Sequence, residues 1–208
     1  MKLIIFGATG GTGRELVSRA LRQGHEVTAF ARNPARLGEE SGLRVLAGDV
    51  LDYPAVENAL SGMDAALIAL GAGLLDKSGV RARGTENVIR AMEKHGVRRL
   101  ICQSGYGAGE SFAGLPFLYR RFIMPVILRR AYADHNRQED RVRRSALDWT
   151  IVRPSNLTDG EAEGKYRVGF TAADKSFTMK ISRADTAEFM LRQLTEDEYL
   201  HAAPGISR

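Results

Sequence analysis

The sequence predicts an α/β protein with a doubly wound parallel sheet. Three observations predict this fold class. Six short runs rich in apolar residues alternate with segments whose apolar residues recur at helical spacing. Several of the helical segments end in glycine, as helix C termini often do. A glycine-rich turn joins the first strand to the first helix, as in nucleotide-binding βαβ units.

The elements follow in a regular order. Strands are expected at residues 2–6, 25–31, 43–47, 64–70, 97–102 and 148–152. Helices are expected over residues 14–24, 53–62, 84–96 and 136–146. A last helix should begin after Ser182, which forms a Ser-x-x-Asp capping box with Asp185. Strands that alternate with helices in this way form βαβ units around a parallel sheet.

Length and composition predict one globular domain over residues 1–208, because 44% hydrophobic residues suffice for a sizeable core. The single cysteine, Cys102, allows no intramolecular disulfide, and its apolar neighbours predict a buried thiol. We therefore expect a reducing, cytoplasmic location. The first apolar run has four residues, too few for a signal peptide, and we expect no membrane partner.

Two segments lie outside the strand and helix alternation. Residues 105–132 are long and aromatic, and they are a candidate lid over a substrate or, alternatively, a packing helix interrupted by Pro125. The segment carries four aromatic residues of interest: Phe112, Phe117, Tyr119 and Phe122. In a lid their side chains would cover a substrate ring, and in a packing helix they would belong to the core. Residues 158–181 are expected to form loops and a hairpin at residues 165–171.

The glycine-rich turn predicts a dinucleotide site. Gly7, Gly10 and Gly13 form G-x-x-G-x-x-G between a predicted strand and a predicted helix. A turn without Cβ atoms lets backbone N–H groups approach a diphosphate at the positive end of the helix. The loop residues expected to contact the cofactor are Gly7, Thr9, Gly10, Gly11, Thr12 and Gly13. The alternative is a glycine-rich turn that binds nothing.

The second strand predicts which dinucleotide binds. NAD-binding proteins carry an acid about 20 residues after the glycines, which accepts hydrogen bonds from the ribose 2′-OH. Here Arg32 and Arg36 follow the strand, with no acid before Glu39. Guanidinium groups bind a 2′-phosphate, so we expect NADP(H) as the cofactor. The alternative is a solvated arginine pair.

Further polar and glycine residues follow the other strands, at the edge where open α/β sheets bind ligands. Asp49 and Val50 follow the third strand and could flank the adenine, and Leu70 and Gly71 follow the fourth. Ser104 follows the fifth strand. Asn156 is the nearest polar group after the sixth. Together these residues mark one edge of the sheet.

The motifs "GATGGTG", "ARNPARL", "GDVLD", "GTENVIRAMEKHGVRRLICQSG" and "LDWTIVRPSNL" resemble those of atypical short-chain dehydrogenases/reductases with a Rossmann fold. Within that superfamily the chain is most similar to the NADPH-dependent flavin reductase or biliverdin reductase B branch, with the NmrA-like regulators nearby. The likeness covers nearly the whole chain except residues 105–132. It implies that nicotinamide lies beside Ser104 and the segment Pro154, Asn156 and Leu157, that His135 lies near that edge, and that flavin binds loosely as a substrate.

Two departures from the family bear on the chemistry. Short-chain dehydrogenases use a Tyr-x-x-x-Lys pair as acid, but here Asn136 stands four residues after Tyr132. Without a neighbouring ammonium group the pKa of Tyr132 has little reason to fall, which disfavours carbonyl reduction. The second departure is Asn156, where the flavin reductase has a histidine beside the nicotinamide. We therefore expect an NADPH-dependent oxidoreductase that passes a hydride to a flavin or similar conjugated acceptor, with Ser104, Asn156 and His135 at the reacting groups.

Other functions stay open. An NADP(H)-binding redox sensor of the NmrA-like type fits the missing Tyr-x-x-x-Lys equally well. A sugar-nucleotide epimerase or dehydratase needs that pair and a larger substrate domain. Residues 116–145 hold eight arginines and three acids and so carry the whole net charge of +5, but this interleaving is typical of a solvated face rather than a nucleic-acid site. The four histidines lack metal-ligand spacing. The expected partner is therefore a small-molecule acceptor, and we expect the protein to be a monomer.

Overall fold

The computed structural model describes residues 1–38, 40–73, 76–169 and 178–208. Its centre is an eight-stranded sheet in the order β3-β2-β1-β4-β5-β6-β10-β8. The six predicted strands are present as β1 (Lys2–Phe6), β2 (Glu26–Ala31), β3 (Leu43–Ala47), β4 (Ala65–Ile68), β5 (Arg99–Gln103) and β6 (Asp148–Pro154). They pair in parallel, which confirms the doubly wound Rossmann fold.

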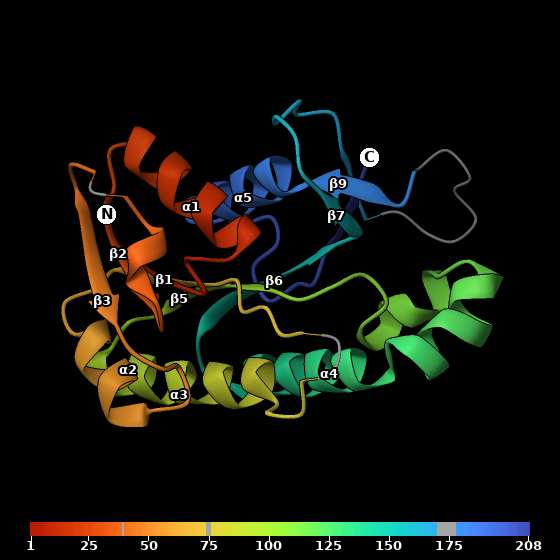
Figure 1. Ribbon diagram of the computed structural model, residues 1–208, viewed down its shortest axis with the longest axis horizontal. Helices are drawn as coiled ribbons and strands as arrows, with labels where there is room; N and C mark the ends of the chain where they lie inside the picture. The colour runs from red at the N-terminus through yellow and green to blue at the C-terminus, as the bar shows by residue number, and fades with distance from the viewer. Residues whose placement is uncertain (39, 74–75, 170–177) are drawn as a thin grey trace.

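Helices cover both faces of this sheet (Figure 1). On one face, α1 (Gly11–Arg22) packs beside α5 (Arg183–Arg192). The other face carries α2 (Tyr53–Leu60), α3 (Val80–His95) and α4 (Arg129–Arg144). Within the described chain, no helix is long and apolar enough to cross a membrane.

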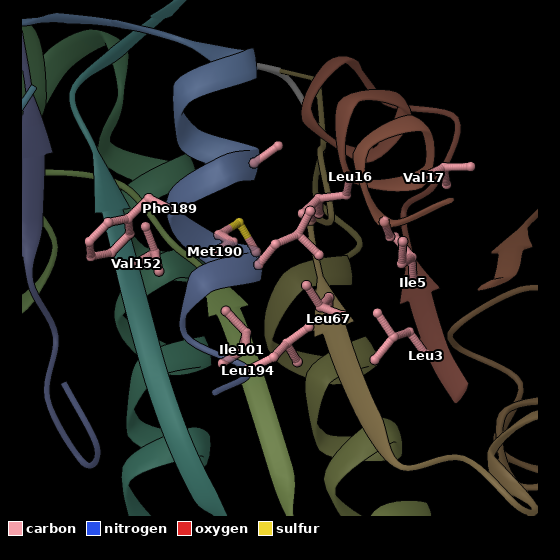
Figure 2. Close-up of a cluster of buried hydrophobic side chains, with 14 of the residues drawn as sticks. Leu3, Ile5, Leu16, Val17, Leu67, Ile101, Val152, Phe189, Met190 and Leu194 are labelled. Atoms are coloured by element: carbon pink, nitrogen blue, oxygen red, sulfur yellow. The ribbon is translucent and has the colours of Figure 1, made fainter. Parts of the chain in front are cut away.

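Each face of the sheet has its own hydrophobic core, because successive strand residues point to opposite sides. Leu3 and Ile5 of β1 pack with Leu16 of α1 and Met190 of α5 (Figure 2). Ile4 and Phe6 point the other way, into the core that α2, α3 and α4 cover. Cys102 is fully buried there, which confirms the predicted buried thiol, and burial raises its pKa.

Three helices begin earlier than the sequence predicted. The first begins at Gly11 rather than near residue 14, so two of the loop glycines belong to its first turn. α3 begins at Val80 rather than residue 84, because Asp134 accepts hydrogen bonds from the N–H groups of Arg81 (3.1 Å) and Ala82 (3.2 Å). α4 begins at Arg129 rather than residue 136 and therefore carries Tyr132, Asp134 and His135.

The C-terminal part adds strands that the sequence did not predict. β7 (Asn156–Thr158) pairs in parallel with β9 (Lys180–Ser182), and β10 (Gly205–Ser207) joins β6. The hairpin expected at residues 165–171 is wrong in its described part, because β8 (Arg167–Val168) pairs with β10 instead. Its last two residues, Phe170 and Thr171, lie outside the described residues. The Ser182 cap is confirmed: its hydroxyl accepts the Asp185 N–H at 2.9 Å.

Residues 105–132 form an arm at the N-terminal end of α4 (Figure 1). It contains the 3₁₀ turn η2 (Gly109–Gly114) and the π-helical segment η3 (Tyr119–Ile127), which includes Pro125. The alternative that its aromatic residues are core is wrong for Phe112, Phe117 and Phe122, which are 39%, 67% and 55% exposed. Tyr119, by contrast, is half-buried and lines a cavity described below.

Candidate cofactor and acceptor site

The glycine-rich turn between β1 and α1 leaves an uncapped helix N terminus. Gly7 has φ +81°, and a Cβ there would overlap the carbonyl of Ala69. A Cβ on Gly13 would overlap the Gly7 carbonyl, so this glycine lets α1 pack against the turn. Among the described residues no side chain caps the first turn of α1, and that turn holds no acid. Its free N–H groups and positive dipole end therefore fit a diphosphate.

An outer cavity of about 490 Å³ opens beside this turn, at the ends of β2 and β3. Nine predicted cofactor residues line it: Gly7, Thr9, Gly10, Arg32, Arg36, Asp49, Val50, Leu70 and Gly71. Within the described chain, neither arginine has an ion pair, and both are exposed. The Val50 carbonyl accepts a hydrogen bond from Asn87 Nδ2 at 2.9 Å, which fixes the loop that could hold the adenine.

An inner cavity of about 360 Å³ lies at the carboxyl ends of β4, β5 and β6. It shares Gly10, Leu70 and Gly71 with the outer cavity, so the two form one continuous groove along the sheet edge. Seven more predicted residues line the inner cavity: Gly11, Thr12, Ser104, His135, Pro154, Asn156 and Leu157. Of the predicted residues, Gly13 lines neither cavity. The apolar wall of the inner cavity consists of Leu115, Tyr119, Leu128, Leu157 and Met179.

Ser104 and His135 form a pair at the floor of the inner cavity. The Ser104 hydroxyl lies 3.3 Å from His135 Nδ1. Its backbone N–H donates to the Val152 carbonyl at 2.8 Å, which anchors the residue to β6. Burial, with a smaller contribution from the charge of Arg81, lowers the pKa of His135 to about 3. The imidazole is therefore neutral at physiological pH and is no source of a proton.

Tyr132 is poorly placed to act as a general acid or base. Its hydroxyl donates a hydrogen bond to the Tyr106 carbonyl at 2.7 Å, and burial raises its pKa to about 12. One turn further along α4, Asn136 Oδ1 accepts the Gly109 N–H at 2.9 Å, at the base of the arm. The prediction that Tyr132 has no depressed pKa is confirmed.

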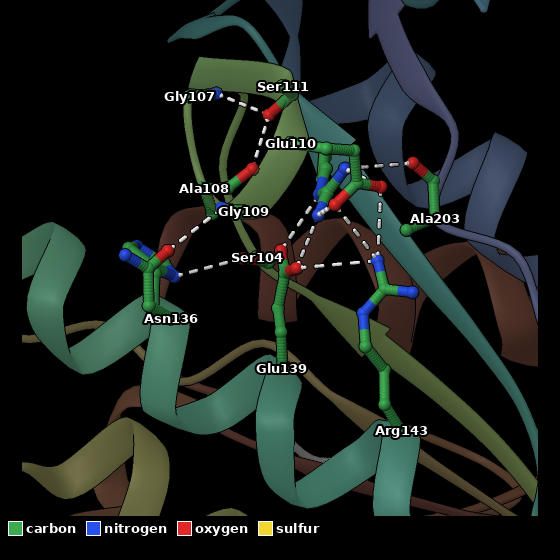
Figure 3. A network of polar contacts seen from close by, with 12 residues as sticks. Ser104, Gly107, Ala108, Gly109, Glu110, Ser111, Asn136, Glu139, Arg143 and Ala203 are labelled. Carbon is green, nitrogen blue, oxygen red and sulfur yellow. Dashed lines mark hydrogen bonds and ion pairs between the residues drawn. The ribbon is translucent and has the colours of Figure 1, made fainter. Parts of the chain in front are cut away.

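Two contacts attach the arm beside the inner cavity. Asn156 Nδ2 donates to the Tyr119 hydroxyl at 3.3 Å, joining β7 to η3. At the base of the arm, the buried guanidinium of Arg153 binds Glu139 (2.9 Å at Nε) and Glu110 (2.8 Å at Nη1). Figure 3 shows both carboxylates there, with Arg143 beside them. These hydrogen bonds lower the pKa of Glu110 to about 2, so the network stays charged at neutral pH.

The polar residues of the inner cavity that were missed from the sequence include Arg81, Gln103 and Arg183. Gln103 ends β5, and its Oε1 is buried with no hydrogen-bond partner in the described part of the chain. Arg183 begins α5, and its side chain lies where a Cβ on Gly11 would be. Its guanidinium also pairs with Asp159 at 2.7 Å. The position of Gln103 at a strand end was a usable signal, whereas the two arginines depend on helix packing that no local motif encodes.

Comparison with known proteins agrees with this geometry. A model of the NAD(P)H-binding family matches residues 7–197. Among curated proteins, a 3 beta-hydroxysteroid dehydrogenase/Delta 5-->4-isomerase of Mycobacterium tuberculosis is 33% identical over 128 residues. That match covers 54% of this chain but 35% of the relative, so the chain spans about a third of that relative's length. YwnB of Bacillus subtilis is 27% identical over 210 residues, which cover 96% of this chain and 94% of that protein.

Solved structures share the fold over the full chain. The oxidoreductase ylbE from Lactococcus lactis superposes with a TM-score of 0.83 at 23% identity, covering 99% of this chain and 90% of that one. ChuY, an anaerobillin reductase from Escherichia coli O157:H7, gives 0.79 at 23% identity, with 99% and 96% coverage. A short-chain dehydrogenase/reductase from Veillonella parvula in complex with NADP gives 0.82 at 15% identity, with 100% and 94% coverage. At these identities the likeness shows the fold.

Proposed function

Because the chain belongs to the NAD(P)H-binding family, whose members include oxidoreductases, we propose that it is an NADPH-dependent reductase that passes a hydride to a flavin or a similar conjugated acceptor. The observation that carries this proposal is the continuous groove. One end carries Arg32 and Arg36 and fits a 2′-phosphate, and the other end widens into an apolar-walled cavity beside Ser104. A nucleotide and a planar acceptor can therefore meet at the carboxyl edge of the sheet.

The protein's own groups position the reactants rather than transfer protons. NADPH, when bound, supplies the hydride. The N terminus of α1 holds the diphosphate, and the outer arginines hold the 2′-phosphate. Ser104 and the neutral His135 offer hydrogen bonds at the cavity floor, and the apolar wall excludes water from the acceptor ring. Catalysis of this kind comes mainly from holding donor and acceptor in contact.

The state of Tyr132 favours a flavin-like acceptor over a ketone. A carbonyl oxygen needs a proton as the hydride arrives, and Tyr132 is occupied by the Tyr106 carbonyl and has a raised pKa. An electron-poor conjugated ring can take its proton from solvent. The same reasoning disfavours an epimerase or dehydratase. The structural relatives ChuY, a reductase, and the Veillonella protein with NADP support the reductase and NADP assignments.

A second candidate is an NADP(H)-binding sensor with little catalysis. The exposed apolar side chains of the arm favour it, since such side chains are typical of a partner surface: Phe117, Leu118, Phe122, Val126 and Ile127. Steady-state oxidation of NADPH, followed by its absorbance with and without FMN or riboflavin, tests the proposal. Flavin-dependent oxidation is expected. If flavin has no effect while NADPH still binds, the reductase proposal fails and the sensor takes its place.

A further inference from the structure

A third cavity, of about 270 Å³, lies between the loop after β4 and the first half of α4. We call it the basic cavity. It shares Arg81 with the inner cavity, so this residue forms part of the wall of both. A substrate whose ring occupies the inner cavity could therefore extend a substituent past Arg81 into the basic cavity.

The lining of the basic cavity is strongly cationic. Five of its residues carry a positive charge: Lys77, Arg81, Arg129, Arg130 and Arg137. Across the parts of the chain that the structure describes, the four besides Arg81 have neither an ion pair nor a side-chain hydrogen bond. Their donors are therefore available to a ligand.

The two carboxylates of the basic cavity are already occupied. Asp76 Oδ1 accepts hydrogen bonds from the N–H and the hydroxyl of Ser78, at 2.6 and 2.5 Å. Asp134 is buried and caps α3 through the N–H groups of Arg81 and Ala82. These carboxylates stabilise the local backbone and neutralise only part of the surrounding positive charge.

Arg81 is the residue that points to an absent anion. It is 9% exposed, and its only ion pair within the described residues joins Nη1 to Asp134 Oδ2 at 3.7 Å, beyond hydrogen-bond distance. Its Nε is buried and has no hydrogen-bond partner among the residues that the structure describes. Buried guanidinium groups are nearly always hydrogen-bonded to an anion or a carbonyl, and a carboxylate or phosphate in the cavity would supply the close charged partner that Arg81 lacks.

We propose that the basic cavity is an anion subsite for the hydride acceptor. Arg81, with Arg130 and Arg137, binds a phosphate or carboxylate carried by the conjugated acceptor whose ring lies in the inner cavity. The substrate class is therefore a planar conjugated compound with an anionic side chain, in preference to its neutral analogue. This inference rests on the proposed function for the identity of the ring.

The test compares flavins with the same ring. FMN carries a phosphate that riboflavin lacks, and lumiflavin-3-acetate carries a carboxylate that lumiflavin lacks. Dissociation constants are measured by calorimetry on protein saturated with NADP⁺, which keeps flavin phosphate out of the 2′-phosphate site. Binding of FMN should be at least about 10-fold tighter than that of riboflavin, as expected for a charge-assisted contact. Preference in only one of the two pairs identifies the anion that the subsite accepts.

The variants separate the subsite from the fold. The double variant Arg130→Ala/Arg137→Ala changes exposed residues outside the inner cavity, and it should reduce the FMN preference several-fold while riboflavin affinity stays unchanged. Arg144→Ala, an exposed arginine of the same helix that lines none of the three cavities, is the matched control and should change nothing. Arg81→Met should remove most of the preference and Arg81→Lys part of it.

Two results would overturn the subsite. One is equal affinity, or none, for the anionic and neutral members of both pairs in the unmutated protein. The other is an equal loss for FMN and riboflavin in the double variant. NADPH oxidation measured in parallel keeps the two proposals apart. If the protein binds the anionic flavins more tightly but oxidises no NADPH, the reductase function fails and the subsite stands. If FMN and riboflavin bind equally well and are turned over equally fast, the subsite fails and the reductase function stands.

Discussion

Replacing Arg32 by alanine should weaken the binding of NADPH and leave the binding of NADH nearly unchanged. Arg32 and Arg36 both line the outer cavity, are exposed, and make no ion pair within the described chain. A charge-assisted contact to a 2′-phosphate contributes about 1.5 to 3 kcal/mol, so its loss should weaken NADPH roughly 10- to 100-fold. Because both side chains are exposed, solvent screening favours the lower half of this range. NADH lacks the phosphate, and its affinity should change little.

The assay is titration of each cofactor by nicotinamide fluorescence at two ionic strengths. The NADPH advantage should shrink as salt rises, since exposed charges are screened. Arg44→Ala is a suitable control, because Arg44 is an exposed arginine of β3 that lines a cavity at the opposite edge of the sheet. Equal losses for NADPH and NADH in Arg32→Ala would refute the 2′-phosphate assignment, as would an NADPH loss of the same size in the control.

Three further outcomes follow from the groove. Gly10→Val should abolish binding of both cofactors while circular dichroism stays native, since the branched side chain fills the diphosphate position; retained binding would contradict the loop assignment. Tyr132→Phe should leave the rate of flavin turnover within a few-fold of the unmutated protein, because Tyr132 is not the general acid and a general acid normally contributes about 100-fold or more. Ser104→Ala should lower the rate further than Tyr132→Phe does. A collapse of the rate in Tyr132→Phe alone would indicate carbonyl reduction. His135 has a folded-state pKa of about 3, below its unfolded value, so the unfolded chain binds the extra proton and stability should fall with pH from about 6.5 downward, by up to about 1.4 kcal/mol per pH unit. Denaturant unfolding of His135→Gln between pH 7 and 5 should show a flatter profile, and an identical slope in both proteins would contradict the neutral imidazole.

The elements with a local signal were predictable from sequence. Apolar strands and the glycine turn place Gly10, Arg32, Ser104 and Asn156 at one sheet edge, and the parallel topology then brings them into one groove. The cap of α5 was equally visible, because Ser182 and its partner are three residues apart. These inferences need only the spacing of apolar and capping residues along the sequence and the parallel direction of the strands.

What could not be predicted depends on contacts between distant segments. α3 begins at Val80 because Asp134, 54 residues later in the chain, caps it, and a segment without its own capping residue gives no boundary signal. The early start of α4 follows a π-helical segment that contains Pro125, where helical periodicity is a poor guide. β10 has three residues and depends on β6 and β8 for its pairing. Arg81 enters the site only because both helices begin where they do.

The positive charge of residues 116–145 divides into two parts with different physical roles. In the C-terminal half of α4, Arg141 pairs with Glu86 at 3.0 Å and Arg143 with Glu110 at 3.2 Å, so these arginines attach the helix to its neighbours. Along the first nine residues of α4, the arginines at 129, 130 and 137 have no ion pair within the described chain and surround the basic cavity. Arg144, at the other end of the helix, also has no ion pair within the described chain, but it lines none of the three cavities. Three of the four unpaired arginines of α4 therefore lie beside the basic cavity and the buried guanidinium of Arg81, which is where an anionic acceptor would be attracted and held.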